Sequence, residues 1–114
     1  MILQFYVDRL EHTSTVISSL VEGVSPEQAS WKPAADRWSI LEVINHLHDE
    51  ECDDFRARLD GTLHHPGEPL PPIDPPRWAI ERKYNERDLT ESLGGFLDER
   101  QKSLQWLRGL QGPN

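Results

Sequence analysis

The sequence predicts an all-α fold, an antiparallel bundle of amphipathic helices, and three observations lead to this expectation. Apolar residues recur at helical spacing in three long segments. Capping motifs precede the second and third of these segments, where Ser39 is followed by Glu42 and Asp88 by Glu91. No segment shows the strict apolar–polar alternation of a half-buried strand. A chain of 114 residues suffices for one domain with a modest core, and we assign residues 1–114 to a single domain.

The first helix is expected over residues 3–21, with Gly23 as its end. Its main apolar stripe contains Leu3, Tyr6, Val7, Leu10, Ile17 and Val21. A second, weaker apolar strip of Phe5, Val16 and Leu20 lies off this stripe. The strip could face a partner chain, but scattered surface residues are an equally good interpretation.

A short helical turn comes next. Ser25 in the cap position and Pro26 in the first helical position begin it, and it is expected to end near residues 31–33. Trp31 and Trp38 are expected to be core anchors on either side of the following helix start.

The second main helix is expected over residues 39–59, and Gly61 ends it. Ser39 and Glu42 form a capping box at its start. Its apolar stripe contains Ile40, Val43, Ile44, Leu47 and Phe55.

Residues 61–87 are expected to form a long connection. Prolines exclude a helix or a central strand from its first half: Pro66, Pro69, Pro71, Pro72, Pro75 and Pro76. Trp78 and Ile80 are expected to hold the connection against the bundle.

The third main helix is expected to begin near Asp88. Its apolar stripe contains Leu89, Leu93, Phe96, Leu97, Leu104, Leu107 and Leu110. Gly94 and Gly95 each weaken a helix by about 1 kcal/mol relative to alanine. A close approach of a neighbouring helix would explain both glycines. We expect Ile44, Leu47, Phe55, Leu93, Phe96 and Leu104 to be buried together.

Composition excludes several classes of partner. The chain has 20 acidic and 12 basic residues and a net charge of −8, which argues against nucleic acid and against an anionic membrane surface. The N-terminal residues lack the pattern of a signal peptide or a membrane span. The single cysteine, Cys52, fits a reducing compartment, and its acidic surroundings argue against an activated thiolate. We therefore expect a cytoplasmic protein.

One edge of the second helix carries a candidate metal site. His46, Glu50 and Asp53 stand at positions i, i+4 and i+7 beside the apolar stripe. An imidazole next to carboxylates can form half of a divalent-metal site, and we take His46 and Glu50 as its ligands. The alternative is a hydrogen-bonded boundary histidine next to a solvated acidic face. His64 and His65, in the connection, are expected to be exposed.

Three charged residues interrupt apolar stripes. Glu51 and Asp54 fall inside the stripe of the second helix, and Arg100 falls inside that of the third. Because an unpaired buried charge costs several kcal/mol, we predict an ion pair between Arg100 and Glu51 or Asp54. The sequence supports neither a serine–histidine–acid nor a cysteine–histidine arrangement.

The order of these elements resembles the DinB/YfiT-like superfamily of four-helix bundles. The resemblance rests on an amphipathic first helix, Ser25-Pro26-Glu27-Gln28 with Trp31 and Pro33, Trp38-Ser39-Ile40 leading into His46-Leu47 and Glu51, a proline-rich loop with Trp78, and a third helix with Arg100 and Leu104-Gln105-Trp106-Leu107. It implies a three-histidine site for nickel, zinc or iron, with His46 as the first ligand. The other two ligands of the family come from an H-x-x-x-H on the last helix, and no H-x-x-x-H occurs in this sequence. Some members of the superfamily are thiol-dependent S-transferases or isomerases.

Our leading interpretation is a DinB-like domain of unassigned activity whose sequence stops before the last helix. Its divalent-metal site, centred on His46, is then incomplete, and it binds metal weakly or not at all. The helix face left open predicts a homodimer. One alternative is a metal-dependent thiol S-transferase or hydrolase whose site a partner chain completes. Another is a non-catalytic dimerising interaction module. The sequence does not identify a small-molecule substrate.

Overall fold

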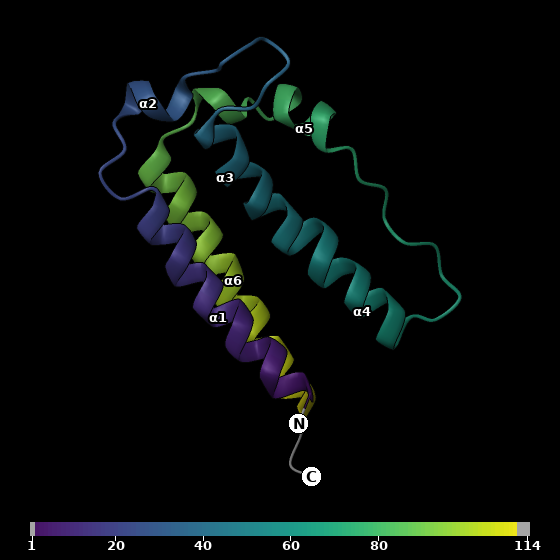
Figure 1. Cartoon of the computed structure of the whole chain (residues 1–114). Helices are drawn as coiled ribbons and strands as arrows, with labels where there is room; N and C mark the ends of the chain where they lie inside the picture. The colour runs from purple at the N-terminus through teal and green to yellow at the C-terminus, as the bar shows by residue number, and fades with distance from the viewer. Residues whose placement is uncertain (1, 112–114) are drawn as a thin grey trace.

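A computed structural model describes residues 2–111, and all regular structure in that range is helical. The elements are α1 (Ile2–Leu20), α2 (Pro26–Ser30), α3 (Ile40–Asp49), the π-helical segment η1 (Glu50–Arg56), α4 (Ala57–His64), α5 (Pro75–Glu81), the 3-10 turn η2 (Tyr84–Glu86) and α6 (Leu89–Gln111). The predicted all-α bundle is thus confirmed (Figure 1).

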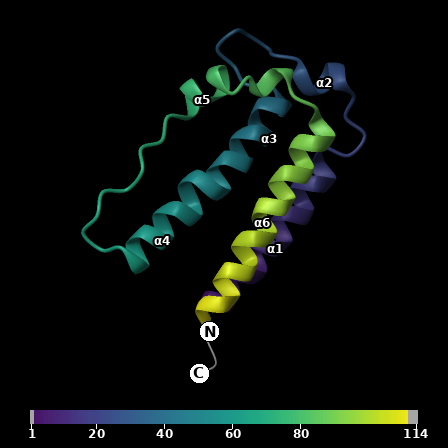
Figure 2. The ribbon, with the colours of Figure 1, turned by 180° about the vertical axis from the view of Figure 1, so that it is seen from behind.

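Helix α6 is the centre of the arrangement. It packs against α1 on one side and against α3 and η1 on the other, whereas α1 has no comparable contact with α3. Figure 2 shows α1 and α6 side by side, with the α3–α4 rod diverging from them. The core between α1 and α6 is built on Val7, Leu104 and Leu107. Of the six residues predicted to be buried together, Ile44, Phe96 and Leu104 are buried, and Leu47, Phe55 and Leu93 are partly buried.

The second main helix is longer than predicted. It begins at the Ser39–Glu42 capping box as expected, but it continues through Gly61 to His64. Gly61 lies inside the helix instead of ending it. Its missing side chain leaves room for Leu70 of the returning loop. A Cβ at Gly61 would lie 3.0 Å from Cδ2 of Leu70.

A seven-residue π-helical segment, η1, interrupts this helix at its middle. A π-turn is wider than an α-turn, so it changes which side chains share a face. Asp53 consequently faces Arg82, with its Oδ2 atom 3.0 Å from Arg82 Nη1. Asp54 instead lies on the same face as Glu50 and Arg58 and interacts with both. The predicted edge of His46, Glu50 and Asp53 is therefore wrong in its third member.

The connection contains a short helix, α5, in its second half, beyond the stretch from which a helix was expected to be excluded. Pro75 and Pro76 begin α5, because the first helical positions need no backbone N–H donor. Asp74 caps this helix through Arg77 N. The expectation for Ile80 is wrong, since it is 79% exposed, whereas Ala79 is buried.

Two further expectations need correction. Trp31 is 65% exposed and is not a core anchor, because α2 contacts α3 through the buried Ala29, whereas Trp38 is partly buried. A Cβ at Gly95 would lie 3.2 Å from His48 Cδ2, so Gly95 is a site of close approach. No atom lies within 4 Å of a Cβ at Gly94, so that glycine has no such role.

Candidate functional site

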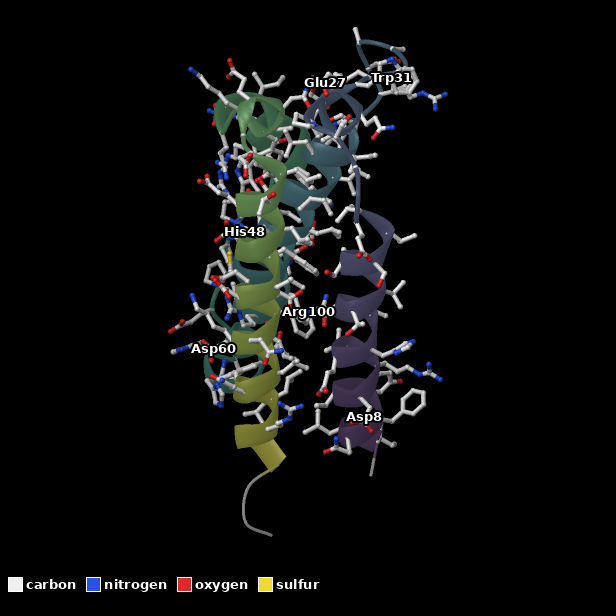
Figure 3. All side chains as sticks on the ribbon, turned by 90° about the vertical axis from the view of Figure 1, so that its left-hand side faces the viewer. Asp8, Glu27, Trp31, His48, Asp60 and Arg100 are labelled. Carbon is white, nitrogen blue, oxygen red and sulfur yellow. The ribbon has the colours of Figure 1, made fainter. Side chains whose placement is uncertain are left out.

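Arg100 forms the buried ion pair that the stripes predicted. Its Nε and Nη2 atoms each lie 3.0 Å from one carboxylate oxygen of Glu51. Its Nη1 donates to the carbonyl oxygen of Leu10 at 2.7 Å and to Thr13 Oγ1 at 3.0 Å. Arg100 lies between α6 and α1 in Figure 3 and joins three helices. The alternative partner, Asp54, pairs with Arg58 instead.

The side of the molecule between α1 and α3 is apolar and open. A hollow of about 270 Å³ there is lined by Ile17, Leu20, Val21, Trp38, Ser39, Ile40, Val43, Ile44 and Leu47, which we call the apolar face. Leu20 is 74% exposed, and Ile40 and Val43 are also exposed. The predicted stripe of the second helix therefore points partly into this open side instead of into a closed core. Ile40 also lines a second apolar hollow beside Trp31, so the two surfaces are continuous.

His46 and Glu50 lie along the flank of the apolar face. His46 Nε2 is 3.7 Å from Glu50 Oε1, one helical turn away. The ring of Trp38 stands edge-on to the imidazole, with 5.0 Å between centroids. Trp38 therefore limits the orientation of His46 and ties it to the helix start.

The electrostatics of this pair favour neutral forms. Burial lowers the pKa of His46, and the charges of Asp49 and Asp54 oppose this effect. A hydrogen bond with Asp54, together with burial and repulsion, raises the pKa of Glu50 to about 7. Near neutral pH, the His46 ring is therefore unprotonated, which is the form that binds metals. The Glu50 carboxyl is still partly protonated at that pH, so a metal ion must displace its proton.

In a comparison with family models, residues 9–113 match the model of the DinB superfamily. The chain belongs to the DinB superfamily. No curated protein and no solved structure matches it. This membership and the helical architecture confirm the resemblance derived from the sequence. In the described range, no helix is both long enough and apolar enough to cross a membrane.

The described residues of this DinB-superfamily domain do not fit a three-ligand metal centre. Within them, no group of three or more His, Cys, Asp or Glu side chains could hold a metal ion. His46 and Glu50 supply two donors, and Asp53 is paired with Arg82. A metal at His46 would need ligands from elsewhere.

A second polar cluster, which sequence reasoning missed, surrounds Asp49. Asp49 is buried, and one of its oxygens lies 2.8 Å from His48 Nδ1. The other oxygen accepts hydrogen bonds from Tyr84 Oη and from Arg82 Nη1. The guanidinium of Arg82 also stacks over Trp78, 4.0 Å from the ring centroid. This cluster, and not Ile80, holds the connection against the bundle.

The other expected reactive groups are unremarkable. Burial raises the pKa of the Cys52 thiol to about 11, and neighbouring carboxylates add to the effect, so Cys52 is not activated. His64 is exposed as expected and pairs with Asp60 at 2.7 Å. His65 lies beside Asp60 and Glu68 and is exposed as well.

Proposed function

We propose that this DinB-superfamily domain works as a homodimer, in which two copies bury their apolar faces against each other. The observation that supports this is the open side between α1 and α3, where large apolar side chains line a hollow that no described segment covers. Contiguous exposed apolar surface of this kind marks an interface.

Charges at the margin favour a second copy as the occupant. Arg9 on α1 has no ion pair among the described residues and only stacks on Phe5, at 5.4 Å. On η1, Glu50 and Asp54 form a carboxyl pair that retains a proton near pH 7, and Asp54 also pairs with Arg58. In a two-fold arrangement each copy can bring its Arg9 to the carboxylates of the other, so one surface serves both chains.

Burial of the apolar face supplies the driving force, at about 25 cal/mol per Å² of apolar surface. The net charge of −8 on each chain opposes association at long range. Added salt screens this repulsion and leaves apolar burial intact, so the dimer should persist at high ionic strength.

Two matched isoleucines test the proposal. Ile40→Glu places a carboxylate on the apolar face, whereas Ile80→Glu places one on an exposed position of α5 outside it. Sedimentation should show that Ile40→Glu weakens dimerisation by about tenfold or more and that Ile80→Glu does not. Equal behaviour of the two variants would contradict the proposal.

A divalent-metal half-site is the second candidate. The supporting observation is the His46–Glu50 pair at 3.7 Å, with a neutral imidazole oriented by Trp38. We propose that these two residues contribute ligands for nickel, zinc or iron, that a partner copy supplies the rest, and that the monomer binds metal only weakly.

Calorimetric titration with Zn²⁺ and Ni²⁺ tests this candidate. The Kd of the wild-type chain for either metal ion should be on the order of 10 µM or weaker. Substitution His46→Ala should abolish binding, whereas His64→Ala, at an exposed histidine, should not. Since a partner copy is required, Ile40→Glu should also weaken binding. Tight, stoichiometric binding by a monomeric variant would refute the half-site.

A further inference from the structure

A polar cavity lies between α3, the η2 segment and the start of α6, away from His46. It measures about 440 Å³ and is lined by Asn45, His48, Glu86, Arg87, Asp88, Glu91, Ser92 and Gly95. Figure 3 shows His48 beside α6, away from α1, whereas Arg100 lies between these two helices. The cavity is therefore separate from the apolar face and from the pair of His46 and Glu50.

Arg87 is held in this cavity without a carboxylate partner. Its Nε and Nη2 donate to the carbonyl oxygen of Arg82, at 3.2 and 3.0 Å, and its Nη1 donates to Asn45 Oδ1 at 3.3 Å. Its guanidinium also stacks on Tyr84, 5.5 Å from the ring centroid. These bonds use about three of the five guanidinium N–H groups, so two remain for a ligand. Among the described residues Arg87 forms no ion pair, although the chain is strongly acidic.

His48 is held with one nitrogen free. Its Nδ1 faces the buried carboxylate of Asp49, which fixes the ring and keeps a proton on that nitrogen. Its Nε2 makes no hydrogen bond to any residue in the described range. Gly95 leaves space for the ring, since a Cβ there would lie 3.2 Å from Cδ2.

The rim of the cavity carries the opposite charge. Glu86 and Glu91 are exposed and have no ion pair within the described part of the chain. Asp88 is occupied, since its Oδ2 accepts the backbone N–H of Glu91 at 2.9 Å. The cavity thus combines a cation at Arg87, the unbonded Nε2 of His48 and two carboxylates without ion pairs.

We propose that this cavity binds a small α-amino-acid zwitterion. The ligand carboxylate pairs with the free N–H groups of Arg87, in the planar geometry that guanidinium favours. The ligand ammonium pairs with the carboxylates of Glu86 and Glu91, and a further polar group of the ligand forms a hydrogen bond with His48 Nε2. The inference is independent of the proposed dimer, because none of these residues lies on the apolar face.

Amide NMR of the labelled full chain tests the site. The twenty proteinogenic L-amino acids are added singly, at a concentration on the order of 10 mM, which would saturate a millimolar site. At least one of these amino acids should shift the amide signals of Asn45, Ser92 and Gly95. Its affinity should be about tenfold higher than the affinity of the corresponding carboxylic acid that lacks the amine. Arg87→Gln should abolish these shifts, whereas Arg37→Gln, at an exposed arginine outside the cavity, should preserve them.

Three outcomes would overturn the proposal. They are the absence of shifts with every amino acid, equal binding of the amine-free acids, and binding that Arg87→Gln leaves unchanged. Gly95→Ala provides a second variant in case Arg87→Gln unfolds the chain. The added methyl group should displace His48 and weaken binding about tenfold, and undiminished binding would count against the site.

Discussion

Arg100 and Glu51 meet in a two-pronged ion pair, with Nε and Nη2 of the arginine each 3.0 Å from one oxygen of the carboxylate. Both side chains are buried between α6 and η1, and the same arginine holds the backbone of α1 through Leu10. This pair fixes the relative positions of the three long helices.

Removing one member of this pair should destabilise the fold more than removing both. Glu51→Gln or Arg100→Met alone should lower the free energy of unfolding by about 3–5 kcal/mol, because a buried charge loses its partner. The double variant should lose less than the sum of the single losses. Urea titrations of the four proteins measure this coupling, and strictly additive losses would contradict it.

The two neighbouring glycines of α6 should respond differently to alanine. Gly94→Ala meets no atom within 4 Å and should stabilise the domain by about 0.4–1 kcal/mol. Gly95→Ala would place its methyl group 3.2 Å from His48 Cδ2, so its gain should be smaller or should become a loss. Thermal melting compares the two. An equal rise in Tm would show that His48 does not pack closely on Gly95.

Two histidines that are two residues apart should titrate on opposite sides of pH 6.5. The hydrogen bond with Asp49 raises the pKa of His48, whereas burial lowers the pKa of His46. An NMR pH titration of the imidazole signals measures both values directly. His48→Gln and His46→Gln assign the signals, and the reverse order of pKa values would contradict the described environments.

The same pKa shifts predict a pH dependence of stability. The raised pKa of His48 means that its contribution is full below pH 6.5 and disappears as the pH rises through its folded-state pKa. The lowered pKa of His46 acts oppositely, since its neutral form is favoured and acidification below 6.5 costs stability. His48→Gln should remove the first dependence only, as seen in urea midpoints at a series of pH values.

Cys52 should react slowly with thiol reagents. Burial raises its pKa to about 11, so the thiolate is scarce at neutral pH. The rate of reaction with a disulfide reagent at pH 7 should be well below that of free cysteine, and denaturant should restore it. A rate in the folded protein that equals the free rate would contradict the burial of the thiol.

The sequence carries information about some of these relationships and not about others. Helical periodicity was sufficient to pair Arg100 with either Glu51 or Asp54, because all three interrupt apolar stripes, and the structure selects Glu51. The π-helical segment had no such signal, since Glu50–Arg56 contains neither glycine nor proline. The sequence therefore did not predict that Asp54 lies beside Glu50 or that Asp53 pairs with Arg82.

The position of the connection against the bundle could not be predicted from the sequence either. Arg82 reaches Asp49 across 33 positions of the chain, and local spacing does not encode a contact of that range. An aspartate off the apolar stripe with several basic residues in a returning loop was the one available hint. Trp31 was misplaced because burial depends on where α2 docks and not on the residue type alone.

The mass of the wild-type chain in solution tests the central proposal most directly. Light scattering at a concentration on the order of 100 µM, in low and in high salt, should give twice the 13.2 kDa of one chain. The Ile40→Glu variant should approach the mass of a single chain, and Ile80→Glu should retain the double mass. A wild-type mass of 13.2 kDa under both conditions would contradict the proposal that two apolar faces pair.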